Sequence, residues 1–177
     1  MPQILSFCNH LLHQKRYSSH TITAYKKDLL QFQQFLKTDY ESENLLEVNS
    51  SMIRSWVVYL IETDITTRTI NRKISSLKSF YKHLLKNKEI NNNPVLKVIT
   101  PKVSKRLPEF VGEIELQNLF QENQFNNDFE GTRDQLILEL FYASGIRLSE
   151  LVNLKINAID FSNSTIKVVG KRNKERI

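Results

Sequence analysis

Residues 66–86 read TTRTINRKISSLKSFYKHLLK. The apolar side chains in this stretch recur three and four residues apart, which predicts an amphipathic helix that buries one face. The apolar positions are Ile70, Ile74, Leu77, Tyr81, Leu84 and Leu85. We expect this helix to end near Lys88, before the Asn-Asn-Asn-Pro run at 91–94.

The opposite face of the same predicted helix combines basic residues with small hydroxyl residues. Its members are Arg68, Arg72, Ser75, Ser76, Ser79, Lys82 and Lys86. Such a face can approach a phosphate backbone closely, since hydroxyls can donate to phosphate and arginine can reach base edges in a major groove. A solvated face with nothing bound is the alternative that the helical pattern leaves open.

Three earlier segments have the same periodicity. The first carries Ile4, Phe7, Cys8, Leu11 and Leu12. A serine pair at 18–19 is suited to cap a helix that runs through Leu36, and one of residues 49–51 is suited to cap a helix that runs through Ile61. Four amphipathic helices with short connections predict a compact four-helix bundle over residues 1–94.

The positive charge is concentrated in one part of the chain. Residues 1–106 hold 17 Lys and Arg against 8 Asp and Glu, whereas residues 107–177 hold 8 against 11. Between residues 66 and 106, 11 basic residues accompany a single acid, Glu89. This distribution favours a polyanionic partner, nucleic acid before membrane. An acidic protein partner remains the competing interpretation.

Several classes of protein are disfavoured by composition. No apolar run approaches the roughly 20 residues that span a bilayer, and no signal peptide is evident, so we expect a cytoplasmic protein. The single cysteine, Cys8, excludes an internal disulfide and a cysteine-based metal site. Its apolar neighbours favour an inert, buried thiol.

Residues 95–108 are predicted to be a basic linker, because prolines break helices and lysines and arginines occur there without an acid. A second pattern follows over residues 109–177. It predicts a short helix from Gly112, a helix from Arg133 that Gly145 ends in a left-handed conformation, and a β-hairpin over residues 156–169. Tyr142 lies on that second helix, and we expect its side chain to be buried in the core. The second part is therefore a mixed α/β domain.

Two basic residues stand out by position. Arg147 follows the helix-ending glycine, and Lys171 lies at the tip of a turn. Arginine suits bidentate contact with phosphate, and the titratable ammonium of lysine can donate a proton. Glu150 lies at i+3 from Arg147 and can hold its guanidinium. A local salt bridge and a solvated turn residue are the competing interpretations.

The segment YASGIRLSEL at 142–151 resembles the first conserved box of the tyrosine recombinase (lambda-integrase-like) family, in its Xer-type form. VGKRNKER at 169–176 is similar to the hairpin-lysine motif of that family, usually G-K-G-x-K-x-R. TINRKISSLKSFY at 69–81 resembles the last helix of its N-terminal core-binding domain. Asn93-Pro94 and Leu107-Pro108 match the exit from that domain and the start of the catalytic domain.

This resemblance implies a mainly α protein, with a four-helix core-binding (SAM-like) bundle and a partial catalytic domain that holds a hairpin or three-stranded sheet. It implies that Arg147 stabilises the scissile phosphate, that Lys171 is the general acid for the leaving 5′ oxygen, and that Glu150 orients the arginine. It further implies contacts with double-stranded DNA, which we assign to Arg68, Arg72, Ser76, Lys82, Lys105, Arg106 and Arg172. Neither a metal nor another cofactor is implied.

The sequence departs from the family pattern in two respects. Arg172 occupies the second glycine position of the turn, which puts the aim of Lys171 in doubt. All four histidines precede residue 84, and no tyrosine follows Tyr142. We therefore expect a fragment that ends before the nucleophile, binds DNA as a monomer and does not cleave it.

The intact protein would cut and rejoin DNA through a 3′-phosphotyrosine intermediate, as four protomers. A non-catalytic DNA-binding regulator and a protein-interaction bundle are the alternatives. The motifs do not separate mobile-element integration from chromosome-dimer resolution.

Overall fold

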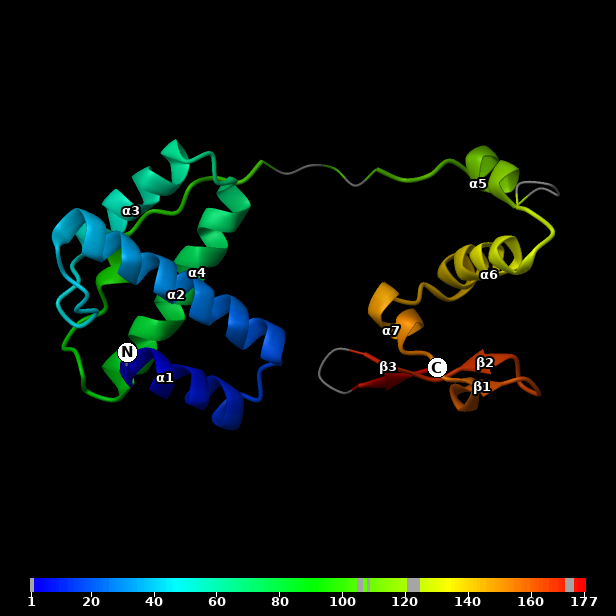
Figure 1. Ribbon diagram of the computed structural model, residues 1–177, viewed down its shortest axis with the longest axis horizontal. Helices are drawn as coiled ribbons and strands as arrows, with labels where there is room; N and C mark the ends of the chain where they lie inside the picture. Colours follow the sequence, from blue (N-terminus) through cyan, green and yellow to red (C-terminus); the bar gives the residue numbers. More distant parts are fainter. Residues whose placement is uncertain (1, 105–106, 108, 121–124, 171–173) are drawn as a thin grey trace. The chain divides into compact units, whose positions relative to one another are not determined.

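The computed structural model describes residues 2–104, 107, 109–120, 125–170 and 174–177. The chain divides into two compact units, Met1–Arg106 and Leu107–Ile177. Figure 1 shows a helical first unit, and a second unit in which helices precede short strands. The mainly α fold predicted from the sequence is confirmed.

The first unit contains the four predicted helices. They are α1 (Pro2–Asn9), continued by the π-helical turn η1 (His10–Gln14), α2 (Ser19–Tyr40), α3 (Ser50–Glu62) and α4 (Thr67–Lys86). Two of the predicted caps are confirmed: Ser18 accepts from the Thr21 amide, and Asn49 accepts from the amides of residues 51 and 52. These bonds satisfy amides that have no partner inside a helix, which fixes where α2 and α3 begin.

Helix α4 contacts α1, α2 and α3, and its apolar stripe is the centre of the core. Phe80 of α4 meets Phe7 of α1 edge to face, with ring centroids 5.5 Å apart. Phe32 of α2 packs on Trp56 of α3 at 4.9 Å. The buried Tyr81 hydroxyl donates to the Leu45 carbonyl at 3.0 Å, which ties the α2–α3 loop to the same helix.

The start of the predicted linker belongs to the bundle. Asn93 caps the short helix η2 (Pro94–Lys97), and Val95 and Val98 are buried beside α3 and α4. Residues 95–98 therefore pack with the bundle, although the sequence placed them in the basic linker. Further along, the Asn71 side-chain amide donates to the Pro101 carbonyl at 2.9 Å, which holds the chain against α4.

The second unit consists of short elements with little core. Its helices are α5 (Glu113–Leu119), α6 (Phe129–Ser144) and α7 (Leu148–Val152), followed by η3 (Ile156–Ala158). Strand β1 (Ile159–Asp160) pairs with β2 (Thr165–Ile166), and β3 (Val168–Val169) pairs with β4 (Glu175–Arg176), both antiparallel. The first pair confirms the predicted hairpin around the turn at 162–164, but its predicted span of 156–169 was too long, since residues 156–158 form η3 and residues 168–169 pair with β4. Tyr142 is 67% exposed, so its placement in a core was wrong.

Candidate functional site

Arg147 and Glu150 form a compact unit at the start of α7. Gly145 ends α6 with φ +56°, a left-handed conformation that suits glycine, and the chain then turns into α7. The Arg147 amide donates to Oε2 of Glu150 at 2.9 Å, and its guanidinium Nη1 donates to Oε1 at 2.7 Å. The ion pair expected at i+3 is confirmed. Glu150 is almost fully buried, whereas the Arg147 side chain is 62% exposed.

A second arginine reaches the same carboxylate from strand β4. Nη2 of Arg176 donates to Oε2 of Glu150 at 2.7 Å and to the Gly145 carbonyl at 3.1 Å. No separate role was predicted for Arg176, although it is the last residue of the hairpin-lysine motif at 169–176. The position of Arg176 in this motif was the one signal that could have predicted its contact with Glu150. Local sequence patterns could not, because the two residues lie 26 apart in the chain.

The electrostatics of the cluster keep Glu150 ionised. The Arg147 amide, followed by the Arg176 guanidinium, lowers the pKa of the Glu150 carboxyl to about 2. One carboxylate therefore faces two guanidinium groups, which leaves an excess positive charge. Because Arg147 is also open to solvent, this charge is available to an anion such as a phosphate.

The β3–β4 hairpin lies against this cluster at Gly170. A Cβ placed on Gly170 would be 3.1 Å from Oε1 of Glu150 and 3.4 Å from Nη1 of Arg147. The Gly170 amide donates to the Lys174 carbonyl at 2.7 Å, which closes the hairpin. The predicted site residues Lys171 and Arg172 follow directly in the chain and lie outside the described residues.

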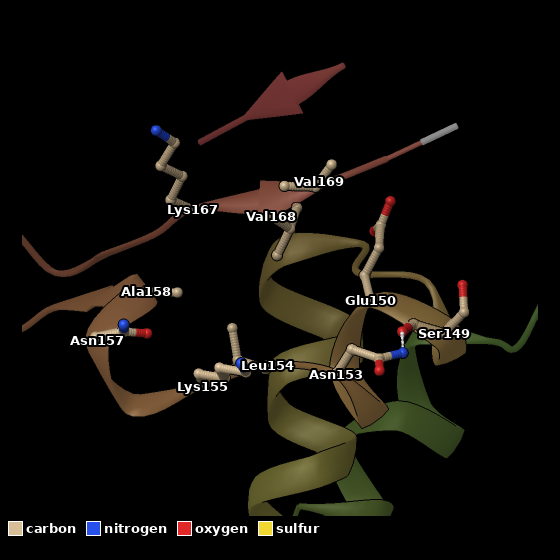
Figure 2. A pocket seen from close by; sticks show the side chains of 10 residues that line it. All are labelled: Ser149, Glu150, Asn153, Leu154, Lys155, Asn157, Ala158, Lys167, Val168 and Val169. Atoms are coloured by element: carbon tan, nitrogen blue, oxygen red, sulfur yellow. Dashed lines mark hydrogen bonds between the residues drawn. The ribbon is translucent and has the colours of Figure 1, made fainter. Parts of the chain in front are cut away.

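A hollow of about 420 Å³ lies beside the cluster, between α7, η3 and β3. Figure 2 shows the Glu150 side chain near Val169 on one side of it, and the hydrogen bond from the Asn153 side-chain amide to the Ser149 carbonyl (2.7 Å) on α7. Arg147 and Arg176 are not among the described residues that line it. The hollow and the arginine pair therefore share only Glu150.

In the first unit, a basic stripe runs along the exposed face of α4. It consists of Arg68, Arg72, Ser75, Ser79, Lys82 and Lys86, spaced by three and four residues. The predicted exposure of Arg68, Arg72 and Lys82 is confirmed. The other two predicted DNA contacts of this unit, Lys105 and Arg106, lie outside the described residues.

Ser76 does not belong to the stripe. It is fully buried, and its hydroxyl donates to Oδ2 of Asp28 on α2 at 2.7 Å. Its predicted place on the exposed, DNA-facing side of the helix was therefore wrong, because an acidic side chain distant in sequence takes its hydrogen bond.

Asp28 is the buried centre of a network that includes one residue of the stripe. Arg72 donates to both carboxylate oxygens, and Lys73 Nζ lies 3.1 Å from Oδ1. The Asp28 side chain is 2% exposed and that of Arg72 46%. Both terminal nitrogens of the Arg72 guanidinium therefore bind Asp28, although the Arg72 side chain as a whole stays partly exposed.

Two kinds of site are not found in the part of the chain that the structure describes. No group of three or more His, Cys, Asp or Glu side chains there could hold a metal ion. No helix there is long and apolar enough to cross a membrane.

Comparison with known proteins gives a family match for each of the two units. Residues 4–88 match the phage integrase N-terminal SAM-like domain, and residues 109–177 match the phage integrase family. The chain belongs to the phage integrase family of tyrosine recombinases. The resemblance seen in the sequence is thereby confirmed.

Among its relatives, the tyrosine recombinase XerC of Staphylococcus haemolyticus is 40% identical over 172 residues, which are 97% of this chain and 57% of that protein. The tyrosine recombinase XerD of Rickettsia conorii is 39% identical over 98% of this chain and 58% of its own length. The chain thus spans somewhat over half the length of these relatives.

Solved structures share the fold at low sequence identity. A lambda integrase (75–356) dimer bound to a COC′ core site matches with a TM-score of 0.72 and 14% identity, over 99% of this chain and 60% of that one. The Tn1549 transposon integrase in complex with a circular intermediate DNA matches with a TM-score of 0.68 and 16% identity, over 98% and 55%.

Proposed function

We propose that this chain is the DNA-binding part, with the first portion of the active site, of a site-specific tyrosine recombinase. The observation that carries the proposal is the Arg147–Glu150–Arg176 cluster with the β3–β4 hairpin packed against it at Gly170. The identity to Xer recombinases and the DNA-bound integrases of the same fold support it.

In this proposal Arg147 binds the non-bridging oxygens of the scissile phosphate and stabilises the charge that develops there. Glu150 is a positioning residue: its carboxylate holds the Arg147 amide and guanidinium in one orientation before DNA arrives. Such preorganised donors lower the barrier without rearrangement during the reaction. Lys171, next to Gly170, donates the proton to the leaving 5′ oxygen.

In this proposal the first unit binds the DNA duplex. The α4 stripe, with Lys105 and Arg106 in the linker, neutralises backbone phosphates, and Arg172 adds a contact from the hairpin. The chain spans somewhat over half the length of its Xer relatives. Cleavage through a 3′-phosphotyrosine, assembly of four protomers on DNA and a cytoplasmic location are therefore proposed for the whole protein, and DNA binding as a monomer for this chain.

An iron chelate at position 171 tests the placement of the hairpin at DNA. The variant Lys171→Cys, in a Cys8→Ser background, carries a tethered iron–EDTA group that cuts any DNA strand nearby. We expect a strand-cleavage yield several-fold above that of a matched Lys37→Cys variant, since Lys37 lies on α2 and pairs with Glu43. Equal yields from positions 171 and 37 would contradict the proposal.

Arg147 is tested by substitution in the same assay. Arg147→Ala and Arg147→Lys should both shift the pattern of cuts made from position 171, because lysine cannot replace the bidentate contact of arginine with phosphate. Arg133→Ala removes an exposed arginine paired with its neighbour Asp134 and should leave the pattern unchanged. An unchanged pattern in both Arg147 variants would argue against a phosphate contact there.

A further inference from the structure

Two histidine rings lie against each other where the N-terminal helix meets the second half of α4. The ring centroids of His10, in η1, and His83, in α4, are 4.6 Å apart. Two hollows of about 580 and 210 Å³ share His10, His83 and Lys86 in their walls. Both lie within the first unit. The proposed recombinase function uses Lys82 and Lys86 from their walls, as members of the α4 stripe, but neither histidine.

The walls of these hollows are cationic. Besides the two neighbouring histidines, the smaller hollow is lined by Lys15, Lys82 and Lys86 and by the hydroxyl-bearing residues Tyr17 and Ser79. Neither Asp nor Glu is among the described residues that line either hollow. Ammonium groups and hydroxyl donors without a carboxylate attract an anion.

The His83 ring carries a donor that lacks an acceptor. Its Nε2 is 3.2 Å from Nδ2 of Asn87, an amide nitrogen that can only donate, so the neutral ring bears its proton on Nδ1. The same Nδ2 lies 3.3 Å from the Glu89 carboxylate, which agrees with this orientation of the amide. Nδ1 is buried and has no partner among the described residues. Buried donors without a partner are rare in folded proteins.

The backbone around His10 is also unusual. Residues His10–Gln14 form a π-helical turn, a wide turn that is rare and often marks a functional site. The turn places His10 opposite His83 and Lys15 in the wall of the smaller hollow. A metal ion is the poorer occupant, because lysine ammonium groups surround the rings and the described residues hold no three-ligand cluster.

We propose that these hollows form an oxyanion site, in which a phosphate group binds between Lys82, Lys86 and the His10–His83 pair. Two residues of the site, Lys82 and Lys86, also belong to the α4 stripe, so a polynucleotide source for this phosphate rests on the DNA-binding function proposed above. A phosphate can come from the backbone of a polynucleotide or from a small phosphate compound, and the two are recognised by the same groups.

Protonation of the histidines follows from this arrangement. Burial and then His10 lower the pKa of His83, which Lys86 lowers further and Glu89 raises. An anion bound beside the two rings would stabilise their protonated forms, so binding should strengthen as the pH falls through the histidine range. The other titratable side chains that line the hollows include those of His13, Lys15 and Tyr17.

The test follows the imidazole nitrogens of the ¹⁵N-histidine-labelled chain by NMR during titration with inorganic phosphate at pH 6.5 and constant ionic strength. We expect saturable shifts at His10 and His83. Lys82→Ala and Lys86→Ala should each weaken phosphate binding at least about fivefold, as expected for loss of a charge-assisted hydrogen bond. Lys78→Ala removes an exposed lysine of the same helix that lines neither hollow. This variant should change the phosphate affinity less than about twofold.

The pH dependence is measured with sulfate, because its charge is constant near neutral pH. The affinity for sulfate should rise as the pH is lowered from 8 to 6. Shifts that do not saturate, equal effects of the Lys86 and Lys78 variants, or a sulfate affinity independent of pH would each overturn the site.

Duplex DNA distinguishes the two sources of phosphate. Competition between DNA and inorganic phosphate at the histidine signals assigns the site to a polynucleotide backbone, whereas simultaneous binding assigns it to a small phosphate compound. The two proposals fail separately. If phosphate does not bind saturably but DNA still binds through Arg68 and Arg72, only the oxyanion site is overturned. If phosphate binds saturably but DNA does not bind, only the DNA-binding function is overturned.

Discussion

Arg176 donates to the Glu150 carboxylate from a strand that lies 26 residues further along the chain, with Nη2 2.7 Å from Oε2. Arg147 binds the same carboxylate through its amide and its guanidinium. Glu150 therefore joins Arg147, at the start of α7, to the β3–β4 hairpin. The contact from Arg176 therefore couples this hairpin to the carboxylate that holds Arg147.

The Glu150 titration should show this link. Its pKa is about 2 in the folded chain, below the roughly 4.3 of an unfolded glutamate, so its contribution to stability is complete above about pH 4.3 and is lost as the pH falls through 2. Arg176→Ala removes the second largest cause of this lowering, so the pKa of Glu150 should rise. Carbon-13 NMR of the side-chain carboxyl measures it.

Arg133→Ala is the matched control for that titration, because Arg133 pairs with Asp134 on the exposed side of α6. It should leave the Glu150 curve unchanged. A Glu150 that titrates near the ordinary glutamate value before any substitution would show that the three-residue cluster does not form in solution.

Gly170→Ala should push the hairpin away from the cluster. The new Cβ would be 3.1 Å from Oε1 of Glu150 and 3.4 Å from the Lys174 carbonyl oxygen, closer than most Cβ contacts. Because the nearest atom ends a side chain that can shift, we expect a loss of at most about 1 kcal/mol in unfolding free energy. The Arg147 amide resonance should move.

Gly112→Ala serves as the comparison for Gly170→Ala, since a Cβ there meets its nearest neighbour, Oε2 of Glu115, at an ordinary 3.7 Å. It should leave the Arg147 resonance in place. The same displacement in both variants would mean that the effect does not come from contact at Glu150.

Asp28→Asn should destabilise the first unit strongly. It leaves Lys73, whose side chain is 10% exposed, without its charged partner, and removal of one member of a buried ion pair costs about 3 kcal/mol or more. Urea unfolding followed by Trp56 fluorescence measures the loss. Asp39→Asn, on the exposed surface of α2, should change stability little, and Lys73→Met in the Asp28→Asn background should restore part of it. Equal stability of the two Asn variants would contradict a structural role for the buried network.

Local sequence rules predicted much of the first unit. The 3-4 spacing located α4, the caps at Ser18 and Asn49 located α2 and α3, and Gly145 marked the end of α6. Each of these features depends on residues a few positions apart, which is the range over which helical periodicity and capping act.

The errors share a different cause. Ser76 is buried because Asp28, 48 residues earlier, comes to lie beside it, and the helical pattern of α4 contains no trace of that neighbour. The role of Arg176 likewise depends on which carboxylate the hairpin meets. Tyr142 was assigned to a core from the apolar residues around it, but those residues pack little against other described residues. Partners distant in sequence decide all three positions.

DNA affinity should fall steeply with salt if the α4 stripe neutralises phosphates. The slope of log K against log salt should become less negative by about 1 in Arg68→Ala and in Lys82→Ala, because each neutralised phosphate releases about one counterion. Arg54→Ala removes an exposed charge from α3 and should leave the slope unchanged. Fluorescence anisotropy of a labelled duplex at several salt concentrations provides the measurement. An affinity that is flat between low and moderate salt would remove the stripe from the DNA interface.

The second unit should open far more readily than the first. Its only buried apolar residues, among those described, are Ile146 and Val168, whereas Phe110, Phe129 and Ile156 are at least 80% exposed. Since local stability follows the apolar contacts that opening must break, amides of α6 should exchange with solvent orders of magnitude faster than those of α4. Hydrogen exchange read by NMR gives both rates in one sample, with the α4 amides as the internal control. Similar protection of the two helices would mean that the second unit has a core in solution that its exposed side chains do not indicate.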